Sequence, residues 1–212
     1  MLSLLAGIAA LCLAAAPPAP PQDPEALWRH RNLGKAFYEN STTQVQAVAE
    51  LKAALDLAPD SARERLNYGL ALLRAGKTEE GVAELLKVEK QDPSLPHPWF
   101  NLGVVYKKAS DYDRAREQFE HMIALVPDEP ASRYNLGVLL AGGGKPDLAL
   151  AEFEKAAALA PQLAGPHFQL YNAYKKAGRA SDAARELATF QEIKKRQAGV
   201  AVPEDLDWSA YA

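Results

Sequence analysis

The sequence predicts an all-α fold, a solenoid of about five stacked helix-turn-helix units, and three observations support this expectation. Prolines recur at one fixed interval, at Pro59, Pro93, Pro127 and Pro161. A landmark of the form Asn-x-Gly, or Gln-Leu-Tyr in its last copy, recurs at the same interval from residue 67 onward. Apolar residues between these landmarks have the spacing of amphipathic helices. Because a fixed period of roughly 20–50 residues is typical of stacked repeats, neighbouring units are expected to share one continuous core.

Each unit is expected to contain two helices joined by a short turn. In the unit that starts near residue 94, small and apolar residues form one stripe before the turn and a second stripe after it. No single helix pair can bury its apolar face alone, so the units must stack. The two stripes are Trp99, Leu102, Gly103 and Tyr106, then Ala115, Phe119 and Met122.

The first and last units depart from the regular length. The landmark at residue 32 lies one position farther from the next landmark than the regular interval, so the first unit carries an extra residue, expected in its turn ENSTTQ. The last unit has Lys195 where the closing proline would fall, so its second helix is expected to continue as a capping helix. The predicted repeat domain spans 23–197, with units at about 24–59, 60–93, 94–127, 128–161 and 162–197.

The third unit, WFNLGVVYKKASDYDRAREQFEHMIALVP, resembles the tetratricopeptide repeat, and the resemblance extends over about four fifths of the chain. It implies a right-handed α-solenoid in which the first helix of every unit lines a concave groove. It also implies a non-enzymatic scaffold that binds a protein or peptide partner, without saying which one. The shared residues in this unit are Trp99, Leu102, Gly103, Tyr106, Ala115, Phe119 and Pro127.

Residues 71–78, ALLRAGKT, satisfy a relaxed form of the phosphate-binding loop pattern. Such a loop follows a strand and has a glycine-rich backbone, whereas the residues from Ala71 to Arg74 are strong helix formers. The turn RAGKT also has counterparts one period apart, KASDY, GGGKP and KAGRA. We therefore expect a helix-to-helix turn in which Gly76 ends the first helix, and no nucleotide site.

Composition argues against several other function classes. The net charge of −3 and the pI near 5.9 disfavour nucleic acid as a partner. The four histidines lie far apart, and the single Cys12 cannot form an intramolecular disulfide. No motif places a nucleophile beside a base or two carboxylates together. We expect no enzyme activity, no metal and no cofactor.

Residues 1–22 are expected to be an export signal followed by a proline-rich spacer. The apolar run from Leu2 to Ala16 is too short to span a bilayer as a helix, and PPAPPQDP follows it. This profile predicts an exported protein, periplasmic or secreted, although no Lys or Arg precedes the run and the cleavage point stays open. Membrane contact is expected only through this segment, where it is not cleaved.

In the architecture that the resemblance implies, the residues flanking the Leu-Gly pair point into the groove. An amide precedes the pair in every unit, and an amide can both donate to and accept from the backbone of an extended peptide. The alternative is that Asn is simply common at this position in the family. The amides are Asn32, Asn67, Asn101, Asn135 and Gln169.

Apolar side chains are expected to supply most of the affinity. A hydrogen bond nets about 1 kcal/mol, while ordering one peptide residue costs roughly 1–2 kcal/mol. We therefore expect a partner segment with alternating apolar residues, about a dozen residues long. Alternatively, another part of this chain or a neighbouring subunit covers the strip. The residues before the amides are Arg31, Leu66, Phe100, Tyr134 and Phe168, and those after the Leu-Gly pair include Lys35, Leu70, Val104 and Val138.

The acidic and aromatic tail at 198–212, AGVAVPEDLDWSAYA, breaks the repeat. It is expected either to fold back onto the last helix or the groove, or to begin a further domain of a longer exported protein. The leading function is a protein interaction scaffold that binds an extended segment. The alternatives are an assembly subunit of a cell-envelope complex that acts through its outer face, and the N-terminal module of a longer exported protein.

Overall fold

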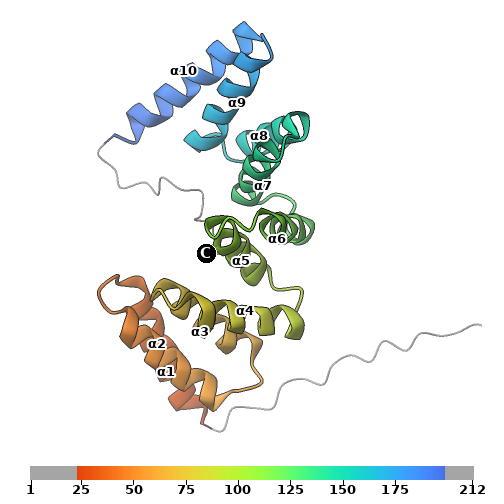
Figure 1. The fold of residues 1–212 in the computed structure, drawn as a ribbon. Coiled ribbons are helices and arrows are strands. Elements are labelled where there is room, and N and C mark those ends of the chain that lie inside the picture. The colour runs from red at the N-terminus through yellow and green to blue at the C-terminus, as the bar shows by residue number, and fades with distance from the viewer. Residues whose placement is uncertain (1–22, 199–212) are drawn as a thin grey trace, which may run out of the picture.

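The computed structural model describes residues 23–198, which form ten helices arranged in five successive pairs (Figure 1). This confirms the all-α solenoid expected from the fixed repeat interval. Each helix packs against its partner, and the second helix of each of the first four pairs also packs against the first helix of the next pair. The helices are α1 (Pro24–Glu39), α2 (Gln44–Leu57), α3 (Ala62–Arg74), α4 (Thr78–Gln91), α5 (Pro96–Lys108), α6 (Tyr112–Leu125), α7 (Pro130–Gly142), α8 (Pro146–Leu159), α9 (Ala164–Lys176) and α10 (Ala180–Arg196).

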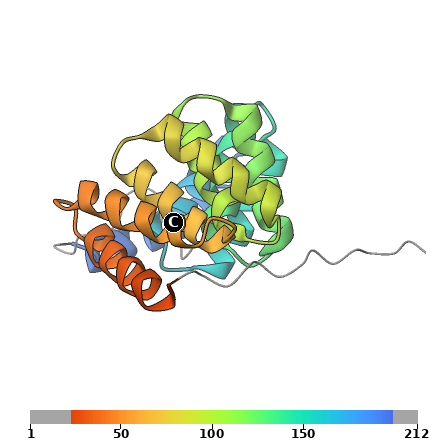
Figure 2. The same ribbon diagram turned by 90° about the horizontal axis from the view of Figure 1, so that it is seen from below.

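Successive pairs are rotated relative to one another, so the helices fan out when the stack is viewed from its end (Figure 2). The stack is open toward the left of Figure 1, between α1 and α2 below and α10 above. Within the described residues, no helix is long and apolar enough to cross a membrane.

Small residues let the two helices of a pair approach closely. A Cβ atom built on Gly103 would lie 2.9 Å from Cε1 of Phe119, which is itself fully buried on α6. Gly137 has the same relation to Phe153 on α8. Any side chain at these positions would therefore push the paired helices apart.

The turns inside the pairs repeat with the same period. Gly76, Gly144 and Gly178 have φ values of +76°, +73° and +72°, and Ser110 occupies the corresponding place with φ +61°. The expectation that GKT belongs to a helix-to-helix turn is confirmed, because α3 ends at Arg74 and α4 begins at Thr78. The first pair is joined by residues 40–43, one residue more than the later pairs, which confirms where its extra residue lies.

The last helix continues beyond the length of its counterparts, as the missing proline predicted. Helices α2, α4, α6 and α8 each have 14 residues, whereas α10 has 17 and passes through Lys195 before ending at Arg196.

Candidate binding groove

Two pockets lie where successive units meet, at the ends of the first helices that lead into the turns, and the start of the second helix contributes to both linings. The α3–α5 pocket has a volume of about 510 Å³ and the α5–α7 pocket about 600 Å³. The α3–α5 pocket is lined by Tyr38, Leu70, Leu73, Arg74, Thr78, Asn101, Val104, Val105, Lys108 and Ala109. The α5–α7 pocket is lined by Lys107, Tyr112, Asp113, Arg116, Val138, Leu139, Leu140, Gly142, Gly143 and Lys145.

The two pockets occupy corresponding places in two consecutive units, and some of their lining residues correspond. Val104 and Val105 of the first correspond, one repeat later, to Val138 and Leu139 of the second. The solenoid thus offers one kind of pocket twice, one unit apart. Because neighbouring helices pack about 10 Å apart, the pockets are separated by roughly that distance.

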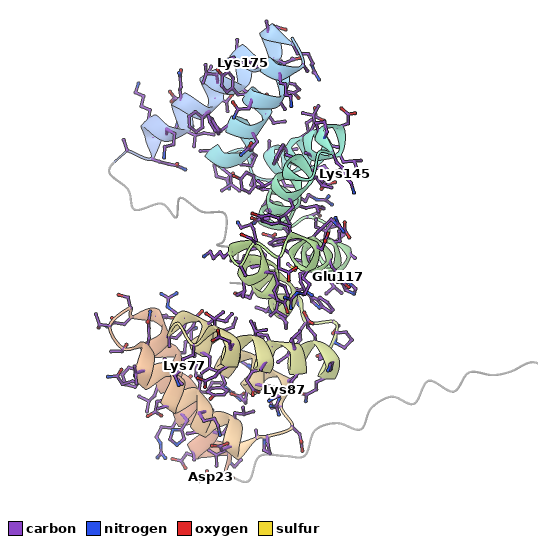
Figure 3. The ribbon with its side chains drawn as sticks, in the orientation of Figure 1. Asp23, Lys77, Lys87, Glu117, Lys145 and Lys175 are labelled. Atoms are coloured by element: carbon purple, nitrogen blue, oxygen red, sulfur yellow. The ribbon has the colours of Figure 1, made fainter. Side chains whose placement is uncertain are left out.

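Apolar and cationic side chains line both pockets, and the α5–α7 pocket also has the carboxylate of Asp113 in its lining. Arg74 and Lys108 border the α3–α5 pocket, and Lys107, Arg116 and Lys145 border the α5–α7 pocket. Lys145, labelled in Figure 3, lies in the turn that leads into α8. Such a surface fits apolar side chains that are flanked by acidic residues.

The groove residues predicted after the Leu-Gly pair lie on this surface. Leu70 and Val104 line the α3–α5 pocket and Val138 lines the α5–α7 pocket. Asn101 also lines the α3–α5 pocket. Lys35, the counterpart of Leu70 in the first unit, is exposed, with its Nζ atom 4.0 Å from Oε1 of Glu39.

The predicted apolar strip before the amides is wrong in its first two members. Leu66 is buried in the core, and Phe100 is fully buried with its ring edge-on to Phe119 of its own pair. Tyr134 is half-buried against Phe153, and only Phe168 is well exposed, at 42%. These residues fill the space between helices, so they do not form a continuous exposed strip.

The predicted amide ladder is interrupted at Asn135. Its side chain has no exposed surface, and its Nδ2 atom donates to the carbonyl of Ala131 at 2.8 Å while Lys107 Nζ donates to its Oδ1 atom at 2.7 Å. Asn101 is half-buried and donates to the carbonyl of His97. The structure therefore corrects Asn135 from a peptide contact to a link between α5 and α7. Asn32 is exposed, and Asn67 and Gln169 are half-buried.

The basic character expected of the first unit is largely neutralised. Arg31 on α1 donates from Nε to Oε1 of Glu64 on α3 at 3.0 Å, and Glu64 is almost completely buried. Arg31 thus links the first two units through an ion pair, and its predicted contact with a ligand stays a prediction.

Sequence reasoning did not predict a set of polar side chains that form hydrogen bonds with the backbone of the connections between units. Arg133 on α7 donates to the carbonyl of Pro127 at 2.7 Å and to Oε2 of Glu152 on α8 at 2.9 Å. The counterparts of Arg133 in other units make the same two contacts or one of them. The regular spacing of these side chains and of their carboxylate partners was the signal that could have revealed them. The pairs are Arg65 with Pro59 and Glu84, Trp99 with Pro93, and His167 with Pro161 and Glu186.

The carboxyl group of Glu89 has a raised pKa. Burial raises the pKa of Glu89 on α4 to about 7, with a further contribution from the negative charge of Glu117 on α6, which is labelled in Figure 3. Burial lowers the pKa of His97 at the start of α5. Within residues 23–198 no group of three or more His, Cys, Asp or Glu side chains is placed to hold a metal ion.

The family of the chain is shown by a match between its sequence and a family model. The family model for the tetratricopeptide repeat matches residues 45–96 and 100–164, which together exceed half of the chain. The chain belongs to the tetratricopeptide repeat family. This family provides scaffolds for protein-protein interaction, in agreement with the groove. No curated protein sequence matches the chain.

Solved structures with the same tetratricopeptide fold include several of MamA. The MamA RS-1 ArsTM double mutant superposes with a TM-score of 0.71 at 20% identity, covering 82% of this chain and 98% of that one. MamA 41-end from Desulfovibrio magneticus RS-1 gives a TM-score of 0.67 at 20% identity, covering 84% and 98%. A further crystal structure of MamA gives 0.68 at 18% identity, covering 84% and 97%. At these identities the likeness shows a common fold.

Proposed function

We propose that this tetratricopeptide protein is a non-enzymatic interaction scaffold that binds an extended segment of another protein in its groove. The observation that carries the proposal is the pair of pockets one unit apart, each lined by apolar and cationic side chains. A side chain buried in each pocket contributes about 1.5–3 kcal/mol. Two such anchors offset the cost of ordering several residues, at roughly 1–2 kcal/mol each.

The spacing of the pockets defines the partner. A chain in the polyproline II conformation rises about 3.1 Å per residue and has three residues per turn, so the side chains at positions i and i+3 lie on the same side about 9 Å apart, close to the separation of the pockets. The partner segment therefore carries two large apolar or aromatic side chains at positions i and i+3, with Asp or Glu beside them. The amides of Asn67 and Asn101 supplement these anchors.

Selection from a phage-displayed library of random peptides, roughly a dozen residues long, tests the proposal. We expect enrichment of two apolar residues at i and i+3 among acidic residues, and binding that Leu70→Glu with Val138→Glu abolishes. Val45→Glu with Leu148→Glu is the matched control, because both side chains are exposed on the second helices α2 and α8. Peptides that lose binding to the control but bind the groove variant would show that the outer face is the binding surface.

We also propose that the chain is exported, on the basis of the apolar run and proline-rich spacer in residues 1–22, which lie outside the described residues. Cell fractionation with N-terminal sequencing of the recovered chain tests this. Recovery of an intact N-terminus from the cytoplasmic fraction alone would contradict it.

A further inference from the structure

We propose that residues 203–212 of this same chain, PEDLDWSAYA, dock in the groove in cis and compete with partners. The inference rests on the proposed function of the groove and names its resident ligand. Residues 199–212 lie outside the part of the chain that the structure describes. In the proposed arrangement, Trp208 occupies the α5–α7 pocket and Tyr211 occupies the α3–α5 pocket.

The spacing of the two aromatic residues matches the spacing of the two pockets. Trp208 and Tyr211 are three residues apart in the sequence, which is one turn of a polyproline II helix, so in that conformation both side chains lie on the same side about 9 Å apart. This is close to the separation expected of pockets that repeat once per unit. The segment thus satisfies the i and i+3 requirement that the groove places on a partner.

The charges of the segment and of the groove are complementary. Glu204, Asp205 and Asp207 precede or flank Trp208, so the acidic residues cluster at the first anchor. The pocket assigned to that anchor is lined by three cationic side chains, Lys107, Arg116 and Lys145, and by one carboxylate, Asp113, which pairs with Arg116 at 3.3 Å, so the formal charge of the lining is positive. Complementary charge of this kind favours one register over others.

The chain between the last helix and the first anchor is long enough. The described chain ends at Ala198 just after α10, on the side toward which the stack is open (Figure 1). The segment from 199 to 208 spans at most about 33–36 Å. The α3–α5 pocket, the farther of the two, lies between two and three units from α9 and α10, or roughly 25 Å. Residues leaving α10 therefore reach the α5–α7 pocket first and the α3–α5 pocket second, in the order of Trp208 and Tyr211.

Because the tail is covalently attached to the solenoid, weak binding is enough for it to occupy the groove most of the time. A short flexible linker gives an effective concentration on the order of 1 mM. A tail that binds in trans with a Kd of roughly 100 μM would then be docked about ten times more often than released. Partners would meet a groove that is already occupied, and their apparent affinity would fall by about the same factor.

Fluorescence anisotropy with a labelled peptide of residues 199–212 tests the inference on full-length chains. We expect this peptide to bind the Trp208→Ala/Tyr211→Ala chain roughly tenfold more tightly than the wild-type chain, whose own tail competes. Leu70→Glu with Val138→Glu, added to the Trp208→Ala/Tyr211→Ala chain, should abolish binding. A peptide of the same composition in which the two aromatics are adjacent should bind weakly.

Three results would overturn the inference. The peptide could bind neither chain, it could bind both with equal affinity, or it could bind in spite of the groove substitutions. A difference between the two chains that disappears on dilution would indicate docking between copies, which also contradicts docking in cis. Peptides selected from the phage library separate this inference from the proposed function. If the selected peptides still bind in the groove, the proposed scaffold function is supported and only the docking of residues 203–212 is contradicted.

Discussion

Lys107 on α5 donates a hydrogen bond from Nζ to the Oδ1 atom of Asn135 on α7 over 2.7 Å, and Asn135 is fully buried. Removing this amide takes a buried hydrogen-bond partner from polar groups of two units. Asn135→Ala should therefore lower the free energy of unfolding by about 1–3 kcal/mol, measured by urea denaturation. Asn32→Ala at the exposed counterpart is the control and should change it by less than about 0.5 kcal/mol. Equal effects would contradict the structural role of Asn135.

The close packing at Gly103 predicts that adding a side chain there lowers stability. A Cβ atom there would lie 2.9 Å from Cε1 of the buried Phe119, so Gly103→Ala should destabilise the chain by about 1–3 kcal/mol. Gly142, at the end of α7, has no atom within 4 Å of its Cβ position. Gly142→Ala should instead stabilise by about 0.5–1 kcal/mol. Thermal unfolding of both variants would reveal the opposite signs, and destabilisation of both would contradict the account.

The turn at Ser110 is strained where its counterparts are not. Ser110 has φ +61°, a left-handed conformation that costs a non-glycine residue roughly 1–2 kcal/mol. Ser110→Gly removes this cost but raises the conformational entropy of the unfolded chain. A net stabilisation of about 0.5–1 kcal/mol is therefore expected. The reverse change, Gly76→Ala, has open space around it and should destabilise by a similar amount through its backbone alone. Chemical denaturation of the pair would test this, and the absence of opposite effects would exclude backbone strain.

The interactions of Arg133 should contribute more to the free energy of unfolding than a surface ion pair does. Its guanidinium holds the Pro127 carbonyl and the largely buried carboxylate of Glu152 at once. Arg133→Ala should cost about 1–3 kcal/mol, because both acceptors lose a donor. Lys52→Ala, which removes an exposed pair with Asp56, should cost less than about 1 kcal/mol. Similar losses of unfolding free energy in the two variants would contradict the role of Arg133 at the link.

Glu89 should make stability depend on pH. Its folded pKa, near 7, lies above the ordinary value of 4.5, so the folded chain keeps a proton that the unfolded chain loses. The free energy of unfolding therefore falls as pH rises through this window. Comparison of the wild type with Glu89→Gln at about pH 5 and about pH 8 should show a steeper fall in the wild type. His97, whose pKa is lowered by burial, acts in the opposite sense and is common to both chains. Parallel pH profiles would contradict the role of Glu89.

The repeat architecture was predictable because a fixed period needs only the positions of Pro, Gly and apolar residues to be visible. The exposure of individual groove side chains was not. Phe100 and Phe168 occupy equivalent positions in their units, yet the first has no exposed surface and the second is 42% exposed. A first helix follows the unit of Phe100 within the described residues, whereas none follows the unit of Phe168. Phe100 packs edge-on to Phe119, whereas Phe168 packs against Tyr171 and Phe190, so exposure at this position depends on the packing of each unit, which the local sequence does not describe.

The amides illustrate the same limit. All five were equivalent in the sequence pattern, but Asn135 is fully buried and accepts from Lys107 on the preceding first helix, whereas Asn32 is exposed. The α3–α5 and α5–α7 pockets depend on equally specific neighbours, since each is built from two units and the turn between two helices. Contacts between units therefore decide which members of a repeated position meet solvent.

If the groove binds partners as proposed, the recurrence of the α3–α5 pocket as the α5–α7 pocket one unit along lets it measure the distance between the anchors of a ligand. A ligand with a single apolar anchor can settle in either pocket, which gains it a statistical factor of two but leaves its register undefined. A ligand with two anchors at the right separation has one register, because a shift by one unit leaves an anchor without a pocket. The groove can thus distinguish ligands by the distance between their anchors, largely independently of the sequence between them.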